Sequence, residues 1–148
     1  MTRRQIREHI LRLIFDYSFC SPGERAAQAE LYFEQAPDEE LPNPPGLADE
    51  EERAYISKKA MQIAKKIPKI DQLLNDTAIG WTTRRMGKTD LAVLRLAVYE
   101  ILYDENVPAG VAINEAVELA KIYCEEEAPA FINGILAKVV PSEKKDGQ

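Results

Sequence analysis

The fold class is decided by one stretch of the sequence, Leu91-Ala92-Val93-Leu94-Arg95-Leu96-Ala97-Val98-Tyr99-Glu100-Ile101-Leu102. Its apolar residues recur at the spacing of a single helix face, at Leu91, Leu94, Val98, Ile101 and Leu102. A period of about 3.6 residues predicts an amphipathic α-helix whose apolar side packs into a core. The strict alternation that would predict a half-buried strand is missing from this stretch.

The same helical spacing recurs on both sides of this stretch. Helices are predicted over Ile6–Tyr17, Ile56–Ile67, Leu73–Trp81, Ala112–Tyr123 and Ile132–Val139. Pro68 stands just before the Leu73–Trp81 helix, where a first helical turn tolerates proline. A weaker helix from Glu24 to about Gln35 depends mainly on Ala27 and Leu31. Because no segment sustains period-two alternation, the sequence predicts an all-α fold.

The principal irregular segment is predicted near residues 37–48. The stretch Pro37–Gly46 contains four of the nine prolines in the chain, and this density cannot continue a helix. A polar tail, 141–148, is predicted to fray. We therefore expect a single domain over residues 1–148, with helical subdomains of about 1–67 and 68–140.

Length and composition restrict the class of protein. The chain has 148 residues, of which 45% are hydrophobic and 30% charged, so it can bury a core of its own. No stretch approaches the roughly 20 apolar residues of a membrane span, and no secretory signal is recognisable. Cys20, Cys124 and the single histidine, His9, do not form a zinc-finger pattern, and the two distant cysteines argue against a disulfide framework. We expect a cytoplasmic protein without metal or cofactor.

Charge is unevenly distributed along the chain, although the net charge is −6. Residues 1–20 carry four arginines against two acids, and residues 55–70 carry five lysines and no acid. Residues 21–54, in contrast, hold ten acids against two arginines. Non-specific binding of nucleic acid by such a chain is expected to be weak. A confined basic site can nevertheless hold an anion.

Motifs for catalysis and nucleotide binding are missing. Gly87-Lys88-Thr89 resembles the end of a phosphate-binding loop, but Thr82 stands where the first glycine is required. No spacing of carboxylates or of nucleophilic residues indicates an active site. His9 is interpreted as a surface or half-buried side chain. Glu125-Glu126-Glu127 is interpreted as a run of acidic residues just before the start of a helix, where they favour the positive end of the helix dipole. Pro129 lies near the first turn of that helix. The sequence therefore predicts a protein that is not an enzyme.

Arginines at the start of the first helix are more informative. Arg3 and Arg7 are four residues apart and share a helix face, with Arg4 beside them. Guanidinium groups bind phosphate oxygens through paired hydrogen bonds. From the residues alone two interpretations remain open, a phosphate-binding surface or an ordinary solvated face.

The C-terminal half contains three sequence blocks that are specific when taken together. They are Trp81…Arg85-Met86…Asp90…Leu94-Arg95-Leu96-Ala97-Val98-Tyr99-Glu100, Val107-Pro108…Val111-Ala112-Ile113-Asn114-Glu115-Ala116-Val117-Glu118-Leu119-Ala120-Lys121 and Phe131-Ile132-Asn133-Gly134-Ile135-Leu136. Together they closely resemble the NusB family, nearly without a break from Trp81 to Val139. The N-terminal arginine-rich helix is similar in kind, whereas residues 21–60 resemble the family only in helical character.

The resemblance implies an all-α fold of about seven helices in two small packed bundles. It also implies a transcription antitermination factor that binds boxA RNA, a single-stranded element of ribosomal-RNA transcripts, as a heterodimer with ribosomal protein S10 (NusE). The heterodimer then acts on elongating RNA polymerase. The positions that match RNA-binding residues are Arg3, Arg4, Arg7, Phe15, Glu127 and Phe131. Asp90 matches an acidic position of the S10 face.

Some of these positions depart from the family pattern or allow another interpretation. Phe15 stands where tyrosine is common, and Ala130 stands where a basic residue often precedes the phenylalanine of the last helix. The alternative interpretation of Phe131 is a core residue beside Ile132, although RNA contact is favoured, and Gly134 is expected to permit close helix packing.

Alternative functions remain open. A free-standing RNA-binding domain of a ribosomal-RNA cytosine methyltransferase shares the fold, but it would require this chain to be a fragment. A helical protein-interaction adaptor, or a homodimer of this kind, is the alternative from another class. RNA binding that depends on Arg3, Arg4 and Arg7 would distinguish an RNA-binding antitermination factor from the adaptor.

Overall fold

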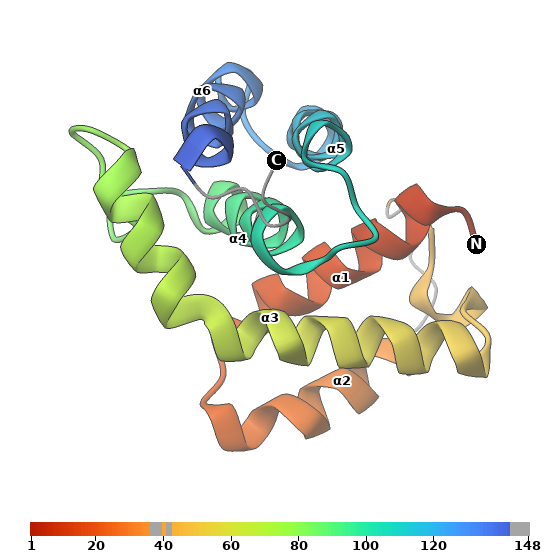
Figure 1. The fold of residues 1–148 in the computed structure, drawn as a ribbon. Helices are drawn as coiled ribbons and strands as arrows, with labels where there is room; N and C mark the ends of the chain where they lie inside the picture. The colour runs from red at the N-terminus through yellow and green to blue at the C-terminus, as the bar shows by residue number, and fades with distance from the viewer. Residues whose placement is uncertain (36–39, 41–42, 143–148) are drawn as a thin grey trace. The chain divides into compact units, whose positions relative to one another are not determined.

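The computed structural model describes residues 1–35, 40 and 43–142, and within these the protein is helical throughout, without a strand. It has six α-helices and two 3-10 helices in this part of the chain: α1 (Arg3–Tyr17), η1 (Pro22–Glu24), α2 (Arg25–Phe33), η2 (Pro45–Leu47), α3 (Glu50–Thr77), α4 (Lys88–Tyr103), α5 (Ala109–Tyr123) and α6 (Ala128–Ser142). Figure 1 shows their order along the chain. The all-α prediction is confirmed.

The difference between the expected seven helices and the observed six lies in α3. Two separate helices were predicted on either side of Pro68, but a single helix, Glu50–Thr77, runs through this proline. Proline inside a helix removes one backbone donor and usually kinks or ends the helix. Here the apolar face continues past it, because Ile63 and Ile70 are both fully buried. Packing of that face outweighs the local penalty.

The chain divides into two compact units, Met1–Ala64 and Lys65–Gln148, which we call unit 1 and unit 2. Helix α3 supplies its first part to unit 1 and its last part to unit 2. The assignment of a single domain with subdomains of about 1–67 and 68–140 stays a prediction.

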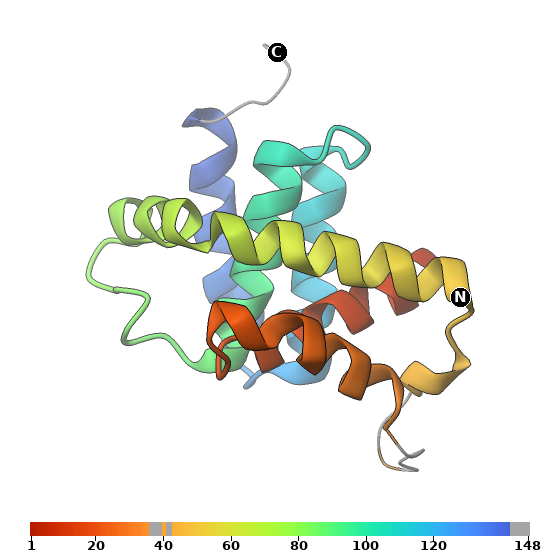
Figure 2. The same cartoon turned by 90° about the horizontal axis from the view of Figure 1, so that it is seen from below.

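Unit 1 consists of α1, α2 and the first part of α3, which runs alongside both of them (Figures 1 and 2). Thr2 caps α1: its hydroxyl accepts from the Gln5 backbone N–H, and the Gln5 side chain accepts from the Thr2 N–H. The buried side chains of α1 include the predicted residues Ile10, Leu13, Ile14 and Tyr17.

The buried face of α2 differs from the prediction. Leu31 and Ala27 are exposed, whereas Ala29, Tyr32 and Phe33 are buried. These three residues also follow helical spacing, and the two aromatic rings bury far more apolar surface than an alanine and a leucine. The helix is therefore rotated to place its aromatic side in the core.

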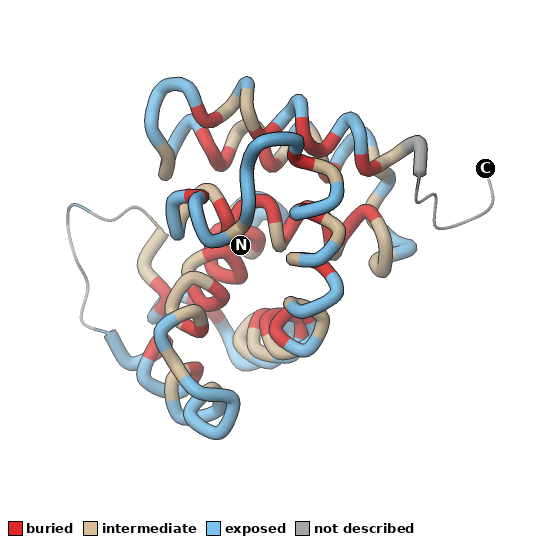
Figure 3. The backbone as a smooth tube through the Cα atoms, turned by 90° about the vertical axis from the view of Figure 1, so that its left-hand side faces the viewer, coloured by how far each residue is buried: buried red, intermediate tan, exposed pale blue. Residues whose placement is uncertain are grey.

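Unit 2 is built around α4, and both α5 and α6 pack against this helix and against each other (Figure 1). The predicted apolar stripes of all three helices are confirmed. Figure 3 shows buried segments alternating with exposed ones along the helices, as expected for amphipathic elements. The buried stripe residues include Leu91, Leu94, Val98, Ile101, Ala112, Ala116, Leu119, Ile132, Leu136 and Val139.

The predicted irregular segment is described only in part, because residues 36–39 and 41–42 lie outside the described residues. Asn43 has a positive φ of 59°, and its carbonyl accepts a hydrogen bond of 2.9 Å from Arg12 on α1. Of the predicted tail, residues 143–148 are also outside the described part, and α6 continues to Ser142. None of the described helices is both long and apolar enough to cross a membrane.

Candidate nucleic-acid interface

The chain between α3 and α4 places Trp81 on the surface. Trp81 was expected on the apolar stripe of a helix, but α3 ends at Thr77 and the Trp81 side chain is 46% exposed. Gly80, with φ of +83°, adopts the left-handed conformation that glycine tolerates best. The Thr83 backbone N–H donates to the Asn75 side-chain oxygen at 2.7 Å, which ties this loop to α3.

Trp81 forms an aromatic and cationic cluster with two other residues of unit 2. Its ring meets the edge of Phe131 at a centroid distance of 5.6 Å and an interplanar angle of 68°. The guanidinium of Arg85 lies 5.5 Å from the centroid of the indole ring. We call Trp81, Arg85 and Phe131 the Trp81 cluster. It offers π-faces beside a positive charge, a combination that suits unpaired bases and phosphates.

Small and exposed neighbours leave the Phe131 ring accessible on α6. Glu127, Ala130, Phe131 and Gly134 follow helical spacing on one face, and Phe131 is half-buried. Gly134 was expected to permit close helix packing, but a Cβ added there would meet nothing within 4 Å. This glycine therefore faces open space. Phe131 belongs to a surface cluster and not to the interior of the core.

Unit 1 carries the predicted arginines at the start of α1. Arg3 and Arg4 are exposed in the first turn, which contains no acidic residue. Cations at the positive end of a helix dipole are unfavourable, so this end of α1 suits an anion. Arg7 differs from the other two, because its side chain is only 9% exposed. Arg7 is therefore not part of the exposed surface that Arg3 and Arg4 form, and its role in RNA binding stays a prediction.

Phe15 is half-buried near the end of α1. Its ring meets that of Phe19 edge to face, with centroids 5.2 Å apart, and Phe19 is exposed. The pair forms an aromatic edge at the surface of unit 1.

The interpretation of His9 as a surface or half-buried residue is wrong. The imidazole is fully buried, and its Nδ1 lies 2.6 Å from the Tyr32 hydroxyl. Burial lowers the pKa of His9, and the nearby charge of Arg12 acts in the same direction, although hydrogen bonding to Asn43 and the charge of Glu8 oppose them. His9 is thus a structural residue that connects α1 to α2.

Asp90 lies in the first turn of α4, beside Gly87, which caps the helix. An acid in this position stabilises the helix through its dipole. Burial and a hydrogen bond to Asp90 raise the pKa of the Cys124 thiol to about 12. Asp90 is therefore tied to the end of α5 as well as to its own helix.

The sequence of almost the whole chain matches one protein family. The family model described as the NusB family covers residues 4–141. The chain belongs to the NusB family. A relative from Agathobacter rectalis, named transcription antitermination protein NusB, is 45% identical over 138 residues, which cover 93% of this chain and 98% of the relative. The protein of the same name from Listeria monocytogenes serotype 4a is 35% identical over 144 residues, 97% of this chain and all of that protein.

Solved structures share the fold. A NusB structure from T. maritima superposes with a TM-score of 0.75 at 27% identity, covering 97% of this chain and 94% of the other. A chain in a crystal structure of a plectonemic RNA supercoil also gives a TM-score of 0.75 and covers 95% of this chain, but at 23% identity it shows the fold alone.

Two residues of the Trp81 cluster were missed as site residues by sequence reasoning. Trp81 and Arg85 stood in the block that resembles NusB, but Trp81 was assigned to a helix stripe and Arg85 to no role. Two adjacent signals, Gly80 before the tryptophan and Arg84-Arg85 after it, pointed to an exposed basic turn. In the described part of the chain, no group of three or more His, Cys, Asp or Glu residues could hold a metal ion.

Proposed function

We propose that this NusB family member is a transcription antitermination factor that binds boxA RNA as a heterodimer with ribosomal protein S10. The complex would act on elongating RNA polymerase in the cytoplasm, notably during ribosomal RNA transcription. The protein would work by binding and not by catalysis. The observation that carries the proposal is the Trp81 cluster, which presents an exposed indole, a half-buried phenyl ring and a guanidinium together.

The cluster suits single-stranded RNA for energetic reasons. Stacking of an unpaired base on an aromatic side chain contributes roughly 1–3 kcal/mol. The Arg85 guanidinium adds attraction to phosphate next to the stacked base, and its contact with the indole orders it in advance. Glu127, exposed one turn before Phe131, can accept hydrogen bonds from base amino groups.

Unit 1 would supply phosphate contacts of its own. Arg3 and Arg4 add two positive charges to backbone N–H groups at the start of α1. Phe15, with Phe19 beside it, offers a further aromatic edge. Arg7 would act indirectly, by supporting α1, because its side chain is nearly buried.

A binding titration tests the RNA proposal. We expect Trp81→Ala to weaken binding of a boxA-like RNA by about 5- to 150-fold, the equivalent of one lost stacking contact. Ile79→Ala is the matched control, since Ile79 is an exposed apolar residue of the same loop. Its affinity should stay within about twofold of the unchanged protein. Equal affinities for both variants and the unchanged protein would refute a role of the cluster.

A second titration tests the S10 partner. If S10 and RNA bind one complex cooperatively, saturating S10 should tighten RNA binding by roughly 5- to 150-fold, and RNA must tighten S10 binding equally. Asp90→Lys should remove this gain and leave the affinity of the isolated protein for RNA nearly unchanged. If S10 leaves the RNA dissociation constant unchanged or competes with RNA, the protein-interaction adaptor becomes the better hypothesis.

A further inference from the structure

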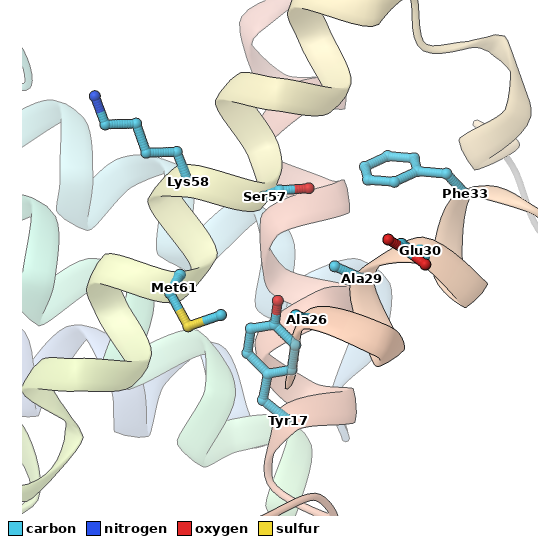
Figure 4. Close-up of a pocket in the computed structure, with 8 residues that line it drawn as sticks. All are labelled: Tyr17, Ala26, Ala29, Glu30, Phe33, Ser57, Lys58 and Met61. Carbon is cyan, nitrogen blue, oxygen red and sulfur yellow. The ribbon is translucent and has the colours of Figure 1, made fainter. Parts of the chain in front are cut away.

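Unit 1 contains a groove that the proposed RNA-binding residues do not use. Its volume is ≈ 380 Å³, and it lies between α2 and the first part of α3, above the end of α1 (Figure 4). The residues that line it are Tyr17, Ala26, Ala29, Glu30, Phe33, Ser57, Lys58 and Met61.

The groove is open because small residues occupy the facing sides of the two helices. Ala26 and Ala29 on α2 face Ser57 on α3, so no long side chain fills the space between them (Figure 4). The remaining walls are largely apolar, with the Phe33 ring at one end and the Met61 thioether at the other. An apolar side chain that covers this surface removes it from water, which lowers the free energy of the complex.

Tyr17 gives the groove a polar point at its floor. The side chain is only 2% exposed, and its hydroxyl has no hydrogen-bond partner among the described residues. Figure 4 shows this hydroxyl pointing into the space between Met61 and the alanines of α2. Burial raises the pKa of Tyr17, so the group stays neutral and can both donate and accept. A buried hydroxyl without a partner is costly, and a ligand that supplies one removes the cost.

The charges at the rim restrict the occupant. Glu30 and Glu34 are exposed one turn apart on the α2 side. On the α3 side, the Lys58 ammonium group points away from the groove (Figure 4). Arg53 lies over the Phe33 ring, but its guanidinium already donates to the carbonyls of Gly46 and Ala48. The α2 rim therefore favours cations and disfavours the phosphates of RNA.

We propose that this groove docks an amphipathic helix of another protein, which inserts a tryptophan or tyrosine against Tyr17 and places basic residues beside Glu30 and Glu34. An aromatic side chain with a polar tip fits both features of the groove, because its ring covers the apolar walls and its N–H or O–H meets the Tyr17 hydroxyl. Basic residues on one flank of the helix complement the acidic rim. The surface is separate from the RNA-binding residues proposed above and serves a protein partner.

A designed helical peptide serves as the probe, with one central tryptophan, lysines along one flank and glutamates along the other. Its binding is measured by fluorescence anisotropy of a label on the peptide. We expect micromolar binding to the full chain and at least about tenfold weaker binding when alanine replaces the tryptophan. Equal binding of the two peptides would overturn the proposal.

Two adjacent alanines provide a matched pair of protein variants. Ala26 lines the groove, and Ala27 is exposed elsewhere on the same helix. Ala26→Trp should fill the groove and weaken peptide binding at least about tenfold, whereas Ala27→Trp should leave it unchanged. Both variants should keep the helical circular dichroism and the boxA-like RNA affinity of the unchanged chain. A peptide that binds Ala26→Trp as tightly as Ala27→Trp would contradict the assignment.

Two milder variants keep the test decisive if Ala26→Trp unfolds. Tyr17→Phe removes only the hydroxyl and should weaken the peptide about fivefold, the usual effect of one hydrogen bond. Glu30→Lys should also weaken it, and a peptide whose lysines are replaced by glutamates should regain affinity for this variant. If neither variant changes binding, or if boxA-like RNA displaces the peptide, the groove does not serve the protein partner that we propose.

Discussion

Arg95 on α4 holds Asp71 on α3 through two parallel hydrogen bonds, from Nε to Oδ1 at 2.9 Å and from Nη2 to Oδ2 at 2.7 Å. Both side chains are largely buried, at 13% and 21% exposure. The paired geometry fixes the last part of α3 against α4 inside unit 2. This ion pair therefore differs from an ordinary surface pair, whose contribution to stability is small.

Asp71→Ala should lower the free energy of unfolding by about 2–4 kcal/mol, because it leaves the Arg95 charge buried without its partner. Urea denaturation measures the effect. Glu118→Ala is the control, since the pair of Glu118 with Lys121 at 2.9 Å is much more exposed. Its loss should cost no more than about 1 kcal/mol. Equal effects of the two substitutions would contradict the structural role of the Arg95–Asp71 pair.

Cys124 should react slowly with alkylating reagents in the folded protein. Its pKa is raised to about 12, whereas a free thiol has a value near 9.0, so the thiolate fraction at pH 8 falls about a thousandfold. Asp90→Asn should speed the reaction, because it removes the negative charge that helps to hold the proton. Mass spectrometry after timed exposure to iodoacetamide measures the rate. A rate at Cys124 equal to that of the unfolded chain would show that the thiol is not protected.

His9 should make the protein less stable in mild acid. Its pKa is lowered in the folded state, so below about pH 6.5 the unfolded chain binds the proton more readily. The free energy of unfolding should therefore fall as the pH drops from 6.5 toward the folded pKa. Above pH 6.5, His9 should cause no pH dependence of stability. His9→Gln should be less stable at pH 7 but should lose that part of the pH dependence. Urea unfolding at pH 5 and pH 7 compares the two proteins; parallel pH profiles would argue against the buried neutral imidazole.

The arginines of α1 should differ in their effects on RNA binding. Replacing Arg3 and Arg4 by alanine should flatten the dependence of RNA affinity on salt, by a log–log slope of about 0.7 for each lost phosphate contact. Arg7→Ala should change that slope little and instead lower the melting temperature, because Arg7 is nearly buried. RNA titrations at several salt concentrations, with thermal melts of each variant, separate the two effects. A salt slope that falls most in Arg7→Ala would show that Arg7 contacts phosphate directly.

The helices could largely be predicted from the sequence, because apolar spacing reports directly which side of a helix is buried. The stripes of α4, α5 and α6 agree with the buried residues for this reason. The prediction was wrong where a local rule competes with packing. Pro68 suggested a helix start, but the buried Ile63 and Ile70 on either side of it keep α3 continuous.

The candidate site was harder to predict than the fold. Arg3, Arg4 and Phe131 were named because they match NusB positions, and they do lie at least partly at the surface. Trp81 and Arg85 were not assigned a role, because their exposure depends on where α3 ends and on a contact with α6, which lies far away in the sequence. His9 shows the reverse case: its polar chemistry suggested a surface position, but the ring is buried, with Nδ1 beside the Tyr32 hydroxyl and Nε2 without a hydrogen-bond partner among the described residues.

The chain has one tryptophan and one histidine, and they fall in different units. Trp81 in unit 2 should change its emission when its cluster is covered or when that unit unfolds. The imidazole proton resonances of His9 should shift when the core of unit 1 opens. Each unit thus contains its own natural spectroscopic reporter, without any label. Following both signals through one denaturation would show whether the two units melt together or one after the other.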